Sequence, residues 1–162
     1  MPRVYIETSI VSYLRQPTSG QIITAARQLL TRRWWEEERS HYELVTSQYV
    51  IDEAADGDPR LARERLDSLA GIPLLQLGPE IDAIAEEITS RAILPSKAQV
   101  DALHIAAAAH HRIDYLLTWN CTHIANARIL PGIRDVLSDL GCFVPIICTP
   151  EEMVDDDQRD ES

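Results

Sequence analysis

The sequence predicts an α/β domain in which a mostly parallel sheet lies between two layers of helices, a three-layer α/β/α architecture. Short apolar segments typical of buried strands alternate with longer segments of helical periodicity. Two of the strand-like segments change to polar residues where a helix begins, which is typical of the carboxyl edge of a parallel sheet. The 162 residues suit a single domain, and they contain no internal repeat and no linker that would divide them.

The first half of the chain is expected to form two strands, each followed by helices. The first strand ends at Glu7, where apolar residues give way to polar ones. Ser47 is placed to cap the helix after the second strand, and Gly71 marks the end of the last helix of this half. The expected elements are, in order, strand 4–6, helix 9–14, helix 21–39, strand 42–46, a helix from 48 that closes at 56, and helix 60–70.

In the second half, Pro73 and Pro145 fall within strand-like segments and predict edge positions, because proline cannot donate a hydrogen bond to a neighbouring strand. A well-marked helix follows Pro95, with Ser96 as its expected N-cap and an interior rich in alanine. The expected elements are, in order, strand 72–77, helix 79–93, helix 96–111, strand 114–119, helix 132–140 and strand 142–148.

The apolar residues of two of these helices are expected to face the core. In the helix over 21–39 they are Ile22, Ala25, Ala26, Leu29, Leu30 and one of Trp34 and Trp35. In the helix over 96–111 they are Val100, Leu103, Ile105 and the run of alanines.

The composition is typical of a soluble globular protein. No apolar run reaches the length of a membrane span, and the N-terminal apolar segment is too short for a secretory signal. An odd number of cysteines without a paired spacing suits a reducing compartment, so we expect a cytoplasmic protein. Residues 155–162 are expected to form an acidic, disordered tail after a single domain over 1–154.

The formal net charge of -11 argues against a protein that coats nucleic acids, since such a protein would carry a basic surface. The charge does not exclude an enzyme that meets phosphate groups through a bound metal ion. A cluster of acidic side chains would then be needed to hold that ion.

Three carboxylates and one amide are expected near the carboxyl edge of the sheet: Glu7, Glu53, Asp101 and Asn120. Taken alone, Asp101 is explained equally well by donors at its own helix start or by water. Acids in apolar surroundings need a cation or hydrogen-bond donors, because burying an unpaired charge is costly. Oxygen ligands without a cysteine–histidine spacing or an HExxH motif favour Mg²⁺ or Mn²⁺ over zinc. His104 is interpreted as a core histidine or a supporting group of the site, not as a ligand.

A divalent ion held by acids can activate a water molecule for in-line attack on a phosphodiester. It also stabilises the charge that develops on the phosphate and on the leaving oxygen. The residues therefore favour hydrolysis of a nucleic acid as the chemistry of this edge.

Four segments of the chain carry a family resemblance: Val4-Tyr-Ile-Glu-Thr-Ser-Ile, Ser47-Gln-Tyr-Val-Ile-Asp-Glu, Asp101-Ala-Leu-His-Ile-Ala-Ala-Ala and Leu116-Leu-Thr-Trp-Asn. Together they resemble the PIN-domain proteins of the VapC type, the metal-dependent ribonuclease toxins of bacterial toxin–antitoxin pairs. The order of the segments is that of the family, and they extend over nearly the whole chain. The resemblance implies a PIN-like fold, an endoribonuclease that uses Mg²⁺ or Mn²⁺, an RNA substrate, a small antitoxin protein as partner, and a homodimer.

The resemblance assigns catalytic and metal-binding roles to Glu7, Glu53, Asp101 and Asn120. Glu7 stands where the family usually has an aspartate, and Asn120 stands where an aspartate is frequent. Asparagine keeps an oxygen but loses the charge, so a single bound ion is expected instead of two. Ser9 and Thr118 match positions where the family often has hydroxyl groups that brace the site.

An alternative from a different functional class is a PIN domain that has lost cleavage and binds RNA or protein, and Glu7 and Asn120 favour it. A phosphoacceptor receiver domain would need a lysine near the end of the last strand, but the only lysine is Lys97. A haloacid-dehalogenase-like phosphatase would need Asp-x-Asp after the first strand, where this chain has Glu7-Thr8-Ser9.

Overall fold

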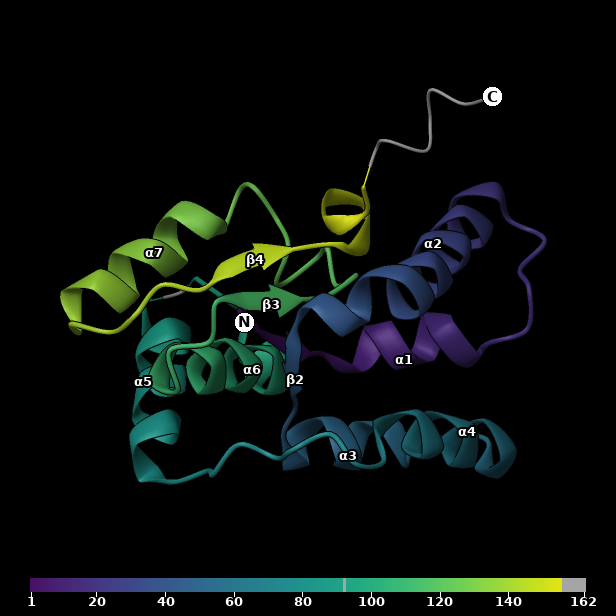
Figure 1. Cartoon of the computed structure of the whole chain (residues 1–162). Helices are drawn as coiled ribbons and strands as arrows, with labels where there is room; N and C mark the ends of the chain where they lie inside the picture. Colours follow the sequence, from purple (N-terminus) through teal and green to yellow (C-terminus); the bar gives the residue numbers. More distant parts are fainter. Residues whose placement is uncertain (92, 156–162) are drawn as a thin grey trace.

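The computed structural model describes residues 1–91 and 93–155 and contains a parallel sheet flanked by helices (Figure 1). The strand order is β2-β1-β3-β4, with β1 at Arg3–Ile6, β2 at Glu43–Val45, β3 at Tyr115–Leu117 and β4 at Ile146–Cys148. The predicted three-layer α/β/α class with a parallel sheet is confirmed. The predicted acidic tail, apart from Asp155, lies outside the described residues.

The α-helices of the described part are α1 Thr8–Arg15, α2 Ile22–Arg33, α3 Gln48–Ala54, α4 Pro59–Leu69, α5 Pro79–Ser90, α6 Gln99–His110 and α7 Leu130–Asp139. A π-helical turn at Trp34–Glu38 extends α2, and 3-10 turns occupy Arg39–His41, Ser96–Ala98 and Pro150–Met153. Helix α6 packs against α5 and against β3, and it is buried along most of its length. Within residues 1–91 and 93–155, no helix has both the length and the apolar character needed to cross a membrane.

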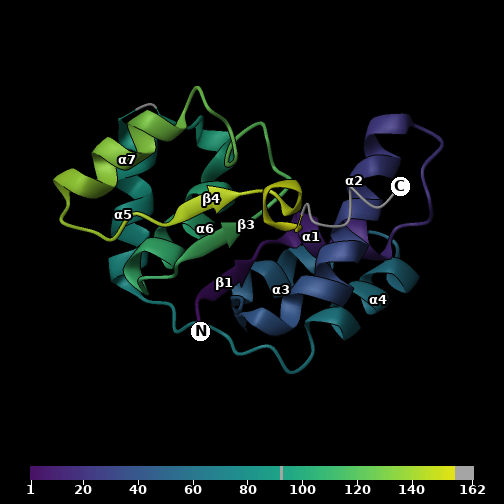
Figure 2. The same ribbon diagram turned by 45° about the horizontal axis from the view of Figure 1, so that its top comes forward.

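The central position of β1 determines where the polar residues after the strands come together. Val4 pairs in parallel with Leu44 of β2 on one side and with Tyr115 of β3 on the other. In Figure 2 the arrows of β1, β3 and β4 point the same way. Because parallel strands end at the same edge of a sheet, Glu7 after β1 and Asn120 after β3 lie at one edge.

The segment over 72–77 does not form the predicted strand. It makes a single parallel bridge between Thr46 and Leu74, in which the Thr46 amide donates to the Pro73 carbonyl and the Leu75 amide donates to the Thr46 carbonyl. Pro73 has no amide hydrogen of its own, so it cannot donate to a neighbouring strand. The edge position predicted for the last strand is confirmed, with Pro145 directly before β4.

The predicted inward face of α2 is wrong at several positions. Ile22 is 87% exposed and Leu29 is 66% exposed, whereas Gln28 and Thr31 are buried. The polar side chains are inside because they have partners there: Thr31 Oγ1 accepts from the indole nitrogen of Trp119 at 2.7 Å, and Gln28 bonds the loop before the helix. Hydrophobic periodicity alone does not register such side-chain hydrogen bonds.

The start of α6 also differs from the prediction. Ser96 makes no capping hydrogen bond, and residues 96–98 form a 3-10 turn before the helix begins at Gln99. Val100, expected to face the core, is 39% exposed. The shift places Asp101 in the first turn of the helix.

The thiol of Cys148, on β4, gives a chemical test of this fold. Burial raises its pKa to about 12, and only the thiolate is nucleophilic. We predict that iodoacetamide at mildly alkaline pH modifies Cys148 at least about tenfold more slowly than the half-buried Cys121 and Cys142. Peptide mass spectrometry over time would measure the three rates.

Denaturant should remove the difference between the three cysteines, which serves as the control. Equal alkylation of Cys148 in the native protein would contradict its placement in the core.

Candidate metal and phosphodiester site

Glu7 is the innermost of the four predicted site residues. It follows β1, acts as the N-cap of α1 and is 4% exposed. Its Oε2 atom accepts from the Ser9 amide at 2.7 Å, from the Ser9 hydroxyl at 2.5 Å and from the Thr118 hydroxyl at 3.1 Å. Ser9 and Thr118, the two hydroxyl residues expected near the site, therefore both contact this carboxylate.

The same two hydroxyl groups join Glu7 to the end of β3. Ser9 Oγ accepts from the Trp119 amide at 2.7 Å, and Thr118 Oγ1 accepts from the Asn120 amide at 2.9 Å. Each hydroxyl donates to the carboxylate and accepts from the backbone. The loop after β3 is thereby held against the start of α1.

Glu53 lies near the end of α3 and is held by two other elements. Its Oε1 atom accepts from the Thr8 hydroxyl at 2.7 Å and from His104 Nε2 at 2.6 Å. Partial burial disfavours the charged form of Glu53, but the hydrogen bonds from His104 and Thr8 outweigh it and lower the pKa of this carboxyl group. Glu53 is therefore held in its charged form.

Asp101 and Asn120 are connected through a residue that the sequence did not single out. His123 Nδ1 lies 3.0 Å from Asp101 Oδ2, and the His123 amide donates to Asn120 Oδ1 at 3.0 Å. The short turn after β3 thus links the first turn of α6 to Asn120. Neither of the simple explanations for Asp101, backbone donors at its own helix start or water alone, accounts for this contact.

The three carboxylates share one arrangement. Glu7 Oε2, Glu53 Oε1 and Asp101 Oδ2 each accept from protein donors, while no described group bonds to the second oxygen of any of them. Among the residues that the structure describes, only Trp34 Nε1 is a fully buried side-chain polar atom without a partner, so none of the three open oxygens is completely buried. Each acid is thus fixed by one oxygen and open at the other.

The two glutamates interact electrostatically and differ in their preferred state. Burial raises the pKa of Glu7 above its usual value, and the charge of Glu53 raises it further, although His104 and Ser9 act in the opposite direction. The fold therefore disfavours the Glu7 carboxylate. A cation at the open oxygens would favour it.

A divalent ion fits these residues in one form. In the described part of the chain, no group of three or more His, Cys, Asp or Glu side chains is arranged to hold a metal ion by itself. Mg²⁺ keeps several of its waters and needs only one or two protein carboxylates. The open oxygens of Glu7 and Glu53 are the carboxylate atoms that could hold such a hydrated ion.

Several supporting residues were not predicted. Thr8 belongs to the polar segment after β1 but has no predicted role, and His123 has none either. The partners of His104 could not be foreseen, since they lie 51 and 99 residues away in the chain. A histidine in an otherwise alanine-rich buried helix was the one available signal.

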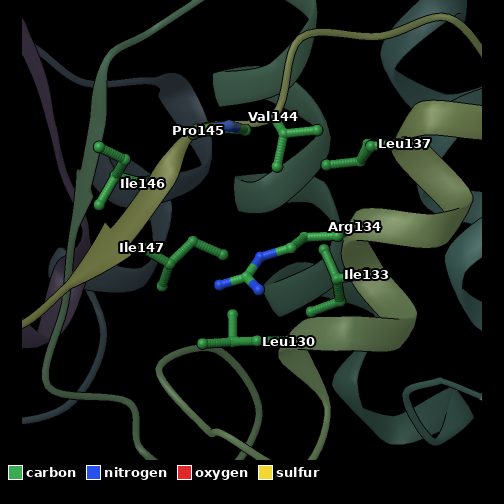
Figure 3. A pocket seen from close by; sticks show the side chains of 8 residues that line it. All are labelled: Leu130, Ile133, Arg134, Leu137, Val144, Pro145, Ile146 and Ile147. Atoms are coloured by element: carbon green, nitrogen blue, oxygen red, sulfur yellow. The ribbon is translucent and has the colours of Figure 1, made fainter.

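Two cavities differ in their position relative to the four predicted site residues. One of about 280 Å³ between α7 and β4 has apolar walls and Arg134 extending across it (Figure 3). An open groove of about 480 Å³ runs along α2 and is lined by Ile22, Ile23, Trp119 and Cys121, so it adjoins Asn120. The groove is therefore one hollow next to Asn120 in the chain.

A comparison with models of protein families and with curated proteins finds no match for this chain.

Replacing Glu7 by glutamine gives a test of its electrostatic state. The folded pKa of Glu7 is raised, so above that pKa the carboxylate opposes folding, and stability increases as pH falls through it. We predict that Glu7→Gln, measured without metal at neutral pH, raises the free energy of unfolding, because it removes a charge that burial disfavours and keeps an oxygen that can accept from the same donors.

Urea denaturation would measure this change, with Glu43→Gln on the exposed end of β2 as the matched control. Lower stability of Glu7→Gln than of the wild-type protein would show that the donors around Glu7 more than compensate its burial.

Proposed function

We propose that this chain is a metal-dependent endoribonuclease of the PIN-domain, VapC-like type, which hydrolyses RNA phosphodiesters. The observation that carries the proposal is the set of three carboxylates at one edge of a parallel sheet, each fixed through one oxygen and open at the other. The four sequence segments that resemble the family contain all of these acids and Asn120.

Each site residue would have its own role in the proposed reaction. A bound Mg²⁺ or Mn²⁺ would supply an activated water and a positive charge beside the phosphate. Glu7 and Glu53 would hold the ion through their open oxygens. Asp101, with its carboxylate held by His123, would orient the water and accept its proton.

The residues that depart from the family pattern suit a single ion. Asn120 contributes no charge, and its Oδ1 already accepts from the His123 amide. The remaining charge of the three acids is enough for one divalent ion. A second ion would need a further carboxylate, as in sites that clamp both the attacking and the leaving oxygen.

We further propose that the protein is the cytoplasmic toxin of a type II toxin–antitoxin pair. The exposed apolar side chains Ile22 and Ile23 on α2 line the groove that reaches Trp119. A small antitoxin bound there would bury this apolar surface and obstruct access to Asn120. A homodimer, as the resemblance implies, would leave one such groove on each copy.

A second candidate is a PIN-like domain that binds RNA or protein without cutting. The observation that favours it is the lack, among the described residues, of a ready three-ligand metal group, together with the raised pKa of Glu7. In this case the polar edge would serve as a binding surface only.

Asp101→Asn is the decisive substitution. It removes a charge but little volume, and we predict that it reduces RNA cleavage by about a hundredfold or more, because an electrostatic group at the reacting centre is lost. Cleavage of a pool of structured cellular RNAs by purified, partner-free protein with Mg²⁺ or Mn²⁺ would measure it.

Two controls accompany this assay. EDTA should abolish cleavage by the wild-type protein, and Asp52→Asn, an exposed acid beside Glu53 on α3, should leave it unchanged. Cleavage that survives EDTA or Asp101→Asn would exclude the proposed site. A folded protein that cuts no RNA with either metal would favour the binding domain.

Shortening Glu7 tests whether the site is built for glutamate. We predict that Glu7→Asp retains at least about a tenth of the cleavage rate. The carboxylate moves back by one methylene, and of the three hydrogen bonds to Oε2 we expect about one to be lost. Single-turnover kinetics at saturating Mn²⁺ would give the rate. Complete loss would mean that the longer acid is required to reach the ion.

A further inference from the structure

A buried chain of hydrogen bonds runs through the protein and ends at Glu53. Ser47 Oγ lies 2.6 Å from the Tyr5 hydroxyl, which lies 2.7 Å from His104 Nδ1. His104 Nε2 then lies 2.6 Å from Glu53 Oε1. Ser47, Tyr5 and His104 are fully buried, and the chain joins β1, the start of α3 and the middle of α6.

The hydrogen-bond chain has one consistent direction, with a single proton in each of its three hydrogen bonds. A charged carboxylate can only accept, so His104 Nε2 donates to Glu53. His104 Nδ1 then accepts from the Tyr5 hydroxyl, and the Tyr5 oxygen accepts from Ser47. In this arrangement every side-chain donor along the chain is used.

A role in packing alone does not account for these contacts. On α6, Ala102, Ile105 and the alanines that follow are buried together with His104. A polar side chain among them costs free energy unless both ring nitrogens are bonded. The rings of Tyr5 and Tyr49 meet the imidazole edge-on at 5.7 Å and 6.3 Å between centroids, which fixes its plane.

We infer that His104 is a positioning residue that directs Glu53 toward the metal ion, with Tyr5 and Ser47 fixing the orientation of its ring. By bonding Oε1, His104 leaves Oε2 as the oxygen that would hold the ion. The inference rests on the proposed function, in which Glu53 is a metal ligand. Groups that hold the ligands of a metal contribute about 10- to 100-fold to its affinity.

The test compares variants that keep or remove the donor. His104→Gln retains an N–H group at the position of Nε2, whereas His104→Leu fills the same space without a donor. Ile105→Ala, a fully buried neighbour on α6, is the matched control for lost core packing. Calorimetric titration of the partner-free protein with Mn²⁺ gives the affinity, and thermal unfolding without metal gives the stability of each variant.

We expect His104→Leu to weaken Mn²⁺ binding by about 10- to 100-fold, and His104→Gln to stay within about threefold of the wild-type protein. Ile105→Ala should lose stability but keep its Mn²⁺ affinity. Unchanged affinity in His104→Leu, an equal loss in Ile105→Ala, or no recovery in His104→Gln would each overturn the inference.

A second measurement needs no metal. Nitrogen-15 NMR of histidine side chains should show His104 with its proton on Nε2, and Glu53→Gln should shift that resonance. A proton on Nδ1 alone, or no response to Glu53→Gln, would overturn the proposed direction of the chain. A wild-type protein that binds Mn²⁺ but cuts no RNA would refute the ribonuclease, while the affinity comparison would still test His104.

Discussion

The buried carboxylate of Glu7 is the constraint on which the candidate site depends. It lies at the end of the central strand, where an unpaired charge would cost several kcal/mol. Donors from Ser9 and Thr118 reduce that cost, and the same hydroxyl groups accept from the backbone after β3. The acid, the start of α1 and the end of β3 therefore hold one another in place.

Glu53 and Asp101 are hydrogen-bonded by other groups than those around Glu7, but they too are each bonded through one oxygen. Glu53 depends on a hydroxyl and an imidazole, and Asp101 depends on the imidazole of His123. In each case one oxygen is occupied and the other is open to solvent. Under the proposed function such a site would take a cation that brings its own water, and the bound cation would favour the charged form of Glu7, which burial disfavours.

The buried hydrogen-bond chain explains why α6 contains a histidine among alanines. Small side chains allow α6 to pack closely against α5 and β3, and the ring of His104 is buried among them. That ring links the central strand to α3 through Tyr5 and Glu53. Packing and polar contacts thus place α6, and with it Asp101, relative to the sheet edge.

The sequence by itself determined the α/β class, the parallel sheet and the position of Glu7 after the first strand, because these depend on local periodicity and on where apolar segments end. It also selected the residue types of the site. It misjudged α2, where Gln28 and Thr31 are inside and Ile22 is exposed, and the strand expected over 72–77. Only the tertiary structure decided the partners of Glu53 and Asp101, since hydrogen bonds between residues far apart in the chain leave no periodic signal.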